Sequence, residues 1–171
     1  MDFKEIVEKR FSERRFDENK EVENEKIEAI LNINKLVPTA KNKQPQRIYV
    51  IKSKEGIEKL KKRATFYGAP VVFMVCTDDN ITTSLEYDPE YTTADTDASI
   101  VGTYMMLEAT NQGLNTIWLR WYNVKELREE FDLEENITPR LLLAVGYPRE
   151  DSKPAHLHYE RKEIEEITKY L

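Results

Sequence analysis

The sequence predicts a layered domain of class α+β or α/β. Segments with apolar residues at helical spacing alternate with short runs rich in β-branched and aromatic residues, which is the pattern of helices packed on a sheet. The 171 residues are 40% hydrophobic and 34% charged, the balance of a folded globular protein. Because no repeat, low-complexity segment or linker interrupts the chain, residues 1–171 are expected to form one domain.

The elements of the N-terminal half follow from local patterns. Ile27, Ile30 and Leu31 recur at helical spacing before Pro38, which stops the helix. The run Arg47–Ile51 then indicates a strand. Along the whole chain, helices are expected over residues 3–9, 23–36, 54–63, 93–112, 123–131 and 162–169, and strands over 47–52, 70–77, 115–120 and 140–146.

Further along the chain, one apolar run and two capping patterns define the elements. Val71–Cys76 is a continuous apolar run opened by an Ala-Pro pair, which indicates a buried strand. Thr92 with Asp95, and Asn123 with Glu126, have the spacing of capping boxes. These pairs mark the expected starts of the helices over 93–112 and 123–131.

The helix over 93–112 is apolar around much of its circumference. Its large apolar residues are Ile100, Val101, Tyr104, Met105, Met106 and Leu107. Ala98, Ser99 and Gly102 are small and would let another backbone come close. A helix that is apolar on every side lies in a core or at a subunit interface, so this helix is expected in one of these two places.

The segment Val37–Gln46 joins a helix to a strand and contains two prolines and two amides, Asn42 and Gln44. Such a rigid turn could direct polar groups at a planar, hydrogen-bonding ligand. Alternatively, Pro38 only ends the helix and the amides satisfy the backbone of the loop. The segment alone does not decide between these interpretations.

The segment Arg10-Phe-Ser-Glu-Arg-Arg-Phe16 places three guanidinium groups and one hydroxyl within seven residues. Arginine suits phosphate because its planar fork donates two parallel hydrogen bonds and keeps its charge. The alternative is a solvated basic segment at the end of a helix, where the dipole mildly favours cations. In a chain with a net charge of −6, the cluster is a local exception.

Together these two segments make the chain resemble the nitroreductase family of flavin-dependent oxidoreductases. The resemblance extends in the expected order over nearly the whole chain, and six weak motifs in register make it specific. The matching residues are Arg10, Ser12 and Arg14; Pro38, Thr39, Asn42, Gln44 and Pro45; Ala69-Pro70 before the strand Val71–Cys76; Asp97-Ala-Ser-Ile; Leu107–Leu114 with Thr116-Ile-Trp118; and Leu143–Pro148 with Arg161 beyond it.

The resemblance implies a particular fold and a bound cofactor. The implied fold is the α+β nitroreductase fold, a mixed central sheet flanked by helices, in an intertwined homodimer with two FMN sites at its interface. Arg10, Ser12, Arg14 and Arg161 would hold the phosphate, while Pro38, Thr39, Ala40 and Asn42 of the other subunit would contact the ring and ribityl chain. The full set of implied cofactor contacts is Arg10, Phe11, Ser12, Arg14, Pro38, Thr39, Ala40, Asn42, Gln44, Leu119, Arg120, Trp121 and Arg161.

The implied activity is transfer of hydride from NAD(P)H to nitroaromatic, quinone or related planar acceptors by a ping-pong mechanism. The flavin would carry the reaction itself, so no catalytic side chain is expected. A non-enzymatic flavin-binding or sensing protein remains the alternative. Its basis is the sequence Arg120-Trp121, where family members often have a glycine-containing turn beside the flavin N5.

Two further departures from the family pattern concern the phosphate and the substrate. Tyr159 stands where a basic residue is common, which would lower the affinity for phosphate. The chain is also short for the family, and the polar stretch Thr77–Thr92 replaces helices that cover the substrate in longer members. With Tyr87 and Tyr91 this stretch would form either a small lid or a surface loop.

Other chemistry finds little support. Cys76 ends an apolar strand, where a buried and inert thiol is expected. His156 and His158 are the only histidines, too few ligands for zinc, so no metal site is expected. The run Lys59–Arg63 could face an anionic cofactor, but a favourable helix C-terminus is the preferred interpretation.

The overall charge and hydropathy limit the partners and the compartment. A net charge of −6 disfavours nucleic acid, which requires a basic face. No apolar run reaches the roughly 20 residues that span a bilayer, and no signal-peptide core follows Met1, so no membrane association is expected. A cytoplasmic protein is the simplest expectation.

Overall fold

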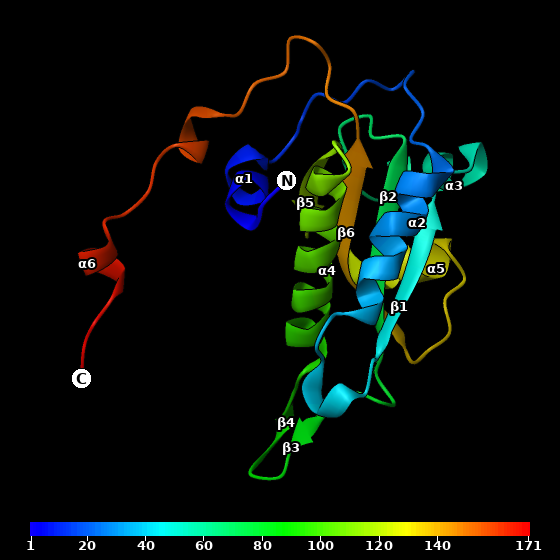
Figure 1. Cartoon of the computed structure of the whole chain (residues 1–171). Helices are drawn as coiled ribbons and strands as arrows, with labels where there is room; N and C mark the ends of the chain where they lie inside the picture. Colours follow the sequence, from blue (N-terminus) through cyan, green and yellow to red (C-terminus); the bar gives the residue numbers. More distant parts are fainter.

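A computed structural model describes all 171 residues, and its centre is a four-stranded sheet (Figure 1). The strands are β1 (Gln46–Ile51), β2 (Val71–Asp78), β5 (Asn115–Leu119) and β6 (Ile137–Gly146). They lie in the order β1-β2-β6-β5, and every neighbouring pair is antiparallel. The parallel pairing of the expected mixed sheet is confined, within this chain, to a single bridge between Ser12 and Thr116.

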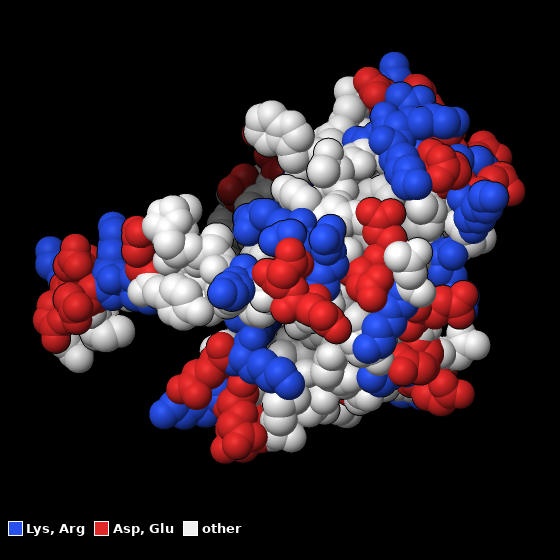
Figure 2. Space-filling view, turned by 90° about the horizontal axis from the view of Figure 1, so that it is seen from above, with Lys and Arg blue, Asp and Glu red and all other residues white.

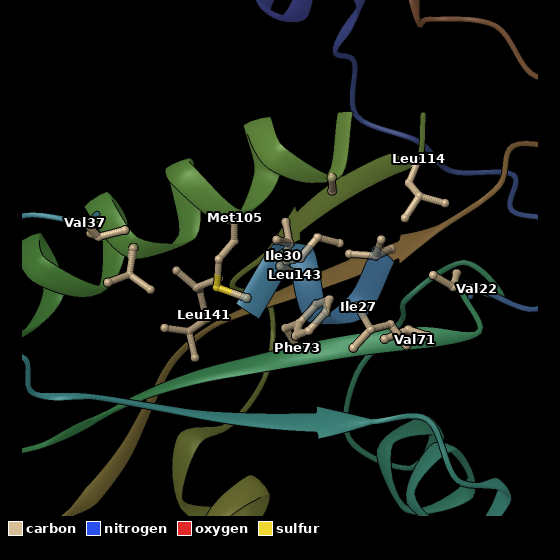
Figure 3. Close-up of a cluster of buried hydrophobic side chains, with 14 of the residues drawn as sticks. Val22, Ile27, Ile30, Val37, Val71, Phe73, Met105, Leu114, Leu141 and Leu143 are labelled. Carbon is tan, nitrogen blue, oxygen red and sulfur yellow. The ribbon is translucent and has the colours of Figure 1, made fainter. Parts of the chain in front are cut away.

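Helices cover both faces of this sheet and bury two apolar clusters. Helices α2 (Asn24–Asn32) and α4 (Ala94–Asn111) pack on one face, where Ile30, Phe73 and Met105 lie in a cluster with residues of β2 and β6 (Figure 3). Helices α3 (Lys54–Lys61) and α5 (Val124–Glu130) cover the other face. Because β2 and β6 are covered on both sides over much of their length, each contains a continuous apolar run, Val71–Cys76 and Leu141–Val145.

The small residues of α4 have a different role from the expected one. Ala98 and Gly102 are buried inside the chain. A Cβ atom at Gly102 would come within 2.8 Å of Leu141 Cδ2 and 2.9 Å of Trp118 Cζ3, so the glycine makes room for side chains of its own sheet. The exposed residues of the helix include Ser99, Thr103 and Tyr104. Any contact of α4 with another chain must therefore use that face.

Two expected capping boxes have different outcomes. Asn123 Oδ1 accepts from the backbone N–H groups of Lys125 at 3.0 Å and Glu126 at 3.2 Å, so Asn123 caps α5 as expected, without the return bond of a full capping box. The prediction of a capping box at Thr92 and Asp95 was wrong, because the residue preceding α4 is Thr93. Its hydroxyl donates 2.8 Å to Asp97 Oδ2 rather than accepting from the helix.

The remaining elements lie at the margins of the two packed layers, where Ile33 still packs against the cluster beneath α2 and α4. They are α1 (Phe3–Lys9), α6 (Ile164–Ile167), the hairpin β3 (Ser84–Leu85) and β4 (Asp88–Thr92), and 3₁₀ turns at Ile33–Lys35, Ala40–Asn42 and His156–His158. The hairpin occupies the polar stretch that was expected as a lid or a loop. The last expected helix shrinks to four residues because it packs on nothing within the chain, and short isolated helices are marginal in water.

Residues 153–171, here called the C-terminal arm, leave the body of the molecule (Figures 1 and 2). Leu157, Ile164 and Ile167 are each more than 60% exposed on the arm. Over the face seen in Figure 2, basic and acidic side chains are interleaved. None of the helices combines the length and apolar character that crossing a bilayer requires.

The basic run and the cysteine agree with the preferred interpretations. Lys59 and Lys61 pair with Glu55 and Glu58 within α3, at 3.1 and 2.8 Å. Arg63 reaches Glu130 on α5 at 2.9 Å, so the run is neutralised by its neighbours. Cys76 is buried, and burial raises the pKa of its thiol to about 12, which keeps it protonated and unreactive near neutral pH.

Candidate functional site

The arginine segment runs beside the edge strand β5. Its backbone is fixed there by a hydrogen bond from Glu13 N–H to Thr116 O at 2.9 Å. Arg15 is engaged in an ion pair with Asp151 at 2.5 Å, whereas Arg10 and Arg14 have no carboxylate partner in the chain. Two guanidinium groups thus remain available for an anion on the surface next to β5.

Phe11 and Ser12 complete the segment. Ser12 is exposed and lies where the segment makes its parallel bridge to β5. Phe11 is half-buried, and its ring lies edge-on to His158 of the C-terminal arm, with 6.3 Å between the ring centroids. Arg161, also on the arm, donates to the carbonyls of Leu157 at 3.3 Å and Glu160 at 2.6 Å. Arg161 thus follows by three residues a histidine that contacts the arginine segment of the same chain, and its guanidinium is bound to carbonyl groups of the arm.

The loop between α2 and β1 has an unusual backbone. Lys41, Asn42 and Gln44 all have φ between 50° and 53°, in the left-handed region that residues with a side chain rarely adopt. Each such residue costs on the order of 1 kcal/mol, and strain of this kind is often kept at ligand-binding sites. The exposed side chain of Asn42 makes no hydrogen bond in the chain. This loop therefore holds an unused amide in a fixed, strained conformation.

Several hydrogen bonds maintain that conformation. Thr39 Oγ1 accepts from Gln44 N–H at 3.0 Å, and Thr39 O accepts from Asn42 N–H at 2.9 Å. Lys43 Nζ donates 3.2 Å to Thr82 O, which links the loop to the chain just before the β3–β4 hairpin. Pro38 is exposed at the start of the loop, and Pro45 is buried at its end.

Asp97 anchors the loop and was not predicted as a site residue. Its side chain is 3% exposed; Oδ1 accepts from Ala40 N–H at 2.8 Å, and Oδ2 accepts from the Thr93 hydroxyl. In the sequence it is visible only as part of the motif Asp97-Ala-Ser-Ile. The signal that could have revealed it is a carboxylate in the first turn of an otherwise apolar helix, where a buried charge needs defined partners.

The segment after β5 turns sharply. Tyr122 N–H donates 3.1 Å to Arg120 O, and the side chain of Arg120 reaches toward Asp95 of α4 at 3.8 Å. Trp121 is 96% exposed. Tyr122 is mostly buried, and burial raises the pKa of its hydroxyl to about 12. The side chain of Arg120 thus points toward α4, and that of Trp121 extends into solvent. In the family pattern, a glycine-containing turn often stands at this place in the chain.

The predicted site residues fall into two groups at opposite edges of the sheet. The arginine segment and the turn after β5 lie along the β5 edge, and the loop between α2 and β1 lies at the β1 edge. Leu119–Trp121 lies at the far end of β5 from Ser12, about 13 Å along the strand from Thr116. The arginine segment and the turn after β5 therefore share one edge of the sheet. Their separation along that edge would let an elongated ligand contact both.

The loop lies at the opposite corner. Gln46, which follows the loop, pairs with Thr77 at one end of β2, whereas Thr116 lies level with Val71 at the other end. This separates the loop from Ser12 by about 20 Å along the strands and about 14 Å across them. One chain does not bring its arginine segment and its own loop together.

This antiparallel sheet with helices on both faces defines an α+β protein with the fold of flavin-dependent nitroreductases. The profile of the nitroreductase family matches residues 7–65 and 57–147. The chain belongs to the nitroreductase family.

Individual relatives agree with this assignment. The chain is similar to a nitroreductase family protein from Clostridium difficile 630, with 39% identity, a TM-score of 0.92, and coverage of 99% of this chain and 98% of that one. A protein from Exiguobacterium sibiricum 255-15, described as a "putative nitroreductase in complex with FMN", shares the fold at 23% identity and a TM-score of 0.84, over 100% and 98% of the two chains. A curated relative from Archaeoglobus fulgidus, "Putative NADH dehydrogenase/NAD(P)H nitroreductase", is 29% identical over 73% of this chain and 74% of its own.

Proposed function

We propose that this protein is an FMN-dependent oxidoreductase that takes hydride from NAD(P)H and passes it to nitroaromatic, quinone or related planar acceptors. The observation that carries the proposal is the division of the site: two unpaired arginines at one corner, and a strained loop with an unused amide at the other. FMN has matching parts, a phosphate dianion and a planar ring with hydrogen-bonding edges. The FMN-bound relative supports the same cofactor.

The arginine segment fits the phosphate. Arg10 and Arg14 would neutralise it, and the exposed Ser12 hydroxyl would donate one hydrogen bond. Arg15 is excluded from this role by its ion pair with Asp151. At the ring end, the chain after Leu119 would offer backbone N–H groups. The folding of Arg120 toward Asp95 leaves space there that its bulk would otherwise fill.

The loop fits the ring and ribityl chain of a flavin held by another subunit. Its left-handed residues fix the direction of the backbone from Pro38 to Gln44, and Asp97 holds Ala40 in place. Asn42 offers both a donor and an acceptor. Since a single chain separates this loop from its own arginine segment, two chains are required for a complete site.

A homodimer is therefore part of the proposal. The C-terminal arm supports it, because its exposed leucine and isoleucines pack on nothing in their own chain. The exposed face of α4, which includes Ser99, Thr103 and Tyr104, offers a second contact surface. Arg161 lies three residues beyond His158, whose ring contacts Phe11, so it would join Arg10 and Arg14 of its own chain at the phosphate.

The chemistry of hydride transfer would be supplied by FMN when bound. The protein residues bind and orient the cofactor and restrict access to it. The β3–β4 hairpin lies next to the ring-binding loop through Lys43 and Thr82, and its Tyr91 hydroxyl lies 3.3 Å from the Thr96 hydroxyl on α4. A short hairpin leaves the site more open than a helical lid would. It therefore favours varied planar acceptors over one tightly held substrate.

Anaerobic mixing tests the activity. The FMN-loaded protein should lose its flavin absorbance within seconds of adding NADH or NADPH, and recover it when a quinone or nitroaromatic compound is added. A ping-pong mechanism should give parallel lines when the reciprocal rate is plotted against the reciprocal NAD(P)H concentration at several acceptor concentrations. If dithionite bleaches the flavin but neither nucleotide does, the oxidoreductase proposal fails in favour of a flavin-binding or sensing protein.

The variant Trp121→Gly locates the cause of such a failure. A large gain in nucleotide oxidation would show that the exposed indole restricts access to the ring. Trp121→Phe is the matched control, because it keeps an aromatic group at the same place.

A further inference from the structure

Glu13 is the least exposed charged side chain in the protein, although it lies between the exposed residues Ser12 and Arg14. Its carboxylate is 0% exposed and accepts four hydrogen bonds. The Oε1 atom accepts from the backbone N–H groups of Arg14 at 2.9 Å and Arg15 at 2.8 Å, and from the Ser152 hydroxyl at 2.5 Å. The Oε2 atom accepts from Asn115 Nδ2 at 2.9 Å.

These four bonds join three separate parts of the molecule. Asn115 begins β5, Ser152 is the last residue before the C-terminal arm, and Arg14 belongs to the segment proposed to bind phosphate. All the donors come from the protein itself, so Glu13 has no role as a direct ligand contact. A buried carboxylate with this many donors is a rigid junction, because the loss of any partner leaves a desolvated polar group.

The junction also determines which way the arginines point. One oxygen holds the N–H groups of two consecutive residues and thereby fixes the peptide planes after Glu13. Arg15 then pairs with Asp151, which adjoins Ser152, while Arg14 remains unpaired. The course of the chain at the base of the arm and the direction of the free arginine are set by the same carboxylate.

We propose that Glu13 is a positioning residue that couples the phosphate-binding arginines to the seating of the C-terminal arm. The inference rests on the proposed function, since it concerns the FMN phosphate. An arm docked on the partner subunit holds Ser152 in place, and Ser152 holds Glu13, which orders the backbone of Arg14. Binding of the FMN phosphate and docking of the arm on the partner subunit then stabilise each other through Glu13.

The variants follow from the roles of the two oxygens. Glu13→Gln keeps an acceptor for the two N–H groups and Ser152 but turns an NH₂ group toward the Asn115 amide, which also donates. Adding Asn115→Asp to Glu13→Gln restores a donor–acceptor pair. Ser152→Ala removes only the link to the arm, and its small change at a half-buried position preserves a test if Glu13→Gln fails to fold.

The experiment measures dissociation constants for FMN and for riboflavin, which lacks the phosphate, by quenching of flavin fluorescence. Glu13→Gln should weaken FMN binding about tenfold or more and leave riboflavin binding within about twofold of the wild type. The double variant should recover most of the lost FMN affinity. Ser152→Ala should weaken FMN binding several-fold, again without an effect on riboflavin.

Equal weakening of FMN and riboflavin in Glu13→Gln would overturn the inference, because a purely structural role affects both flavins. Unchanged FMN binding in Ser152→Ala would overturn the coupling to the arm. Both results require a wild-type protein that binds FMN. A wild type that binds neither flavin would overturn the proposed function itself, and this inference with it.

Discussion

Arg10→Ala is expected to weaken FMN binding roughly 10- to 150-fold. Arg10 is half-buried beside β5 and has no carboxylate partner, so its charge is free to meet the phosphate. A hydrogen bond to a charged group contributes about 1.5–3 kcal/mol, which corresponds to this range of affinity. The measurement is a fluorescence titration of the apoprotein with FMN.

Arg15→Ala is the matched control. It removes the same charge from the same segment, but Arg15 is committed to Asp151, so FMN affinity should change by less than about threefold. Riboflavin binding should not change in either variant. Equal effects of the two substitutions would mean that the segment acts only through its overall charge, and unchanged binding in Arg10→Ala would remove Arg10 from the phosphate site.

Replacing both isoleucines of α6 in the full-length chain is expected to abolish the dimer and, with it, the flavin. Ile164 and Ile167 are each 64% exposed in the single chain, so Ile164→Asp with Ile167→Asp should leave the fold of the body intact. In a dimer the same side chains would be buried, and burying two carboxylates without partners costs several kcal/mol. Light scattering and the flavin absorbance of the purified protein report the two effects.

The conservative pair Ile164→Val with Ile167→Val controls for this change and should remain a yellow dimer. A monomer of the aspartate variant that still binds FMN tightly would refute the shared site. Substitutions at Ala98 or Gly102 do not serve this purpose. Both residues are buried against their own sheet, so a glutamate there would disrupt the core of the chain rather than an interface.

Much of the fold follows from local patterns in the sequence. The strands β2 and β6 were predicted within a few residues because a doubly covered strand is a continuous apolar run, and the capping pair Asn123 and Glu126 marked the start of α5. The β3–β4 hairpin was not predicted, since its residues are exposed and polar and lack the alternation that indicates a strand. The direction of strand pairing also depends on contacts between distant segments.

The residues of the candidate site also include some that local sequence motifs predict and some that they do not. Arg10, Ser12, Pro38 and Asn42 are predicted as cofactor contacts from the family resemblance, because the motifs that carry it are short and local. Glu13 and Asp97 were missed as site residues, because each acts through hydrogen bonds to segments far away in the sequence. A glutamate between a serine and two arginines has the appearance of a solvated charge, and only the packed structure buries it.

The central claim is that each FMN is held by the arginine segment of one chain and the Pro38–Gln44 loop of the other. It is tested most directly with two flavin-free variants, Arg10→Ala with Arg14→Ala and Asn42→Ala with Asp97→Ala, co-expressed with different affinity tags. Mixed dimers selected through both tags would contain one intact site and one doubly damaged site. A site shared between two chains predicts about one FMN per mixed dimer and none in either parent. Mixed dimers that bind no FMN would contradict it, because a site built within one chain is damaged in both partners.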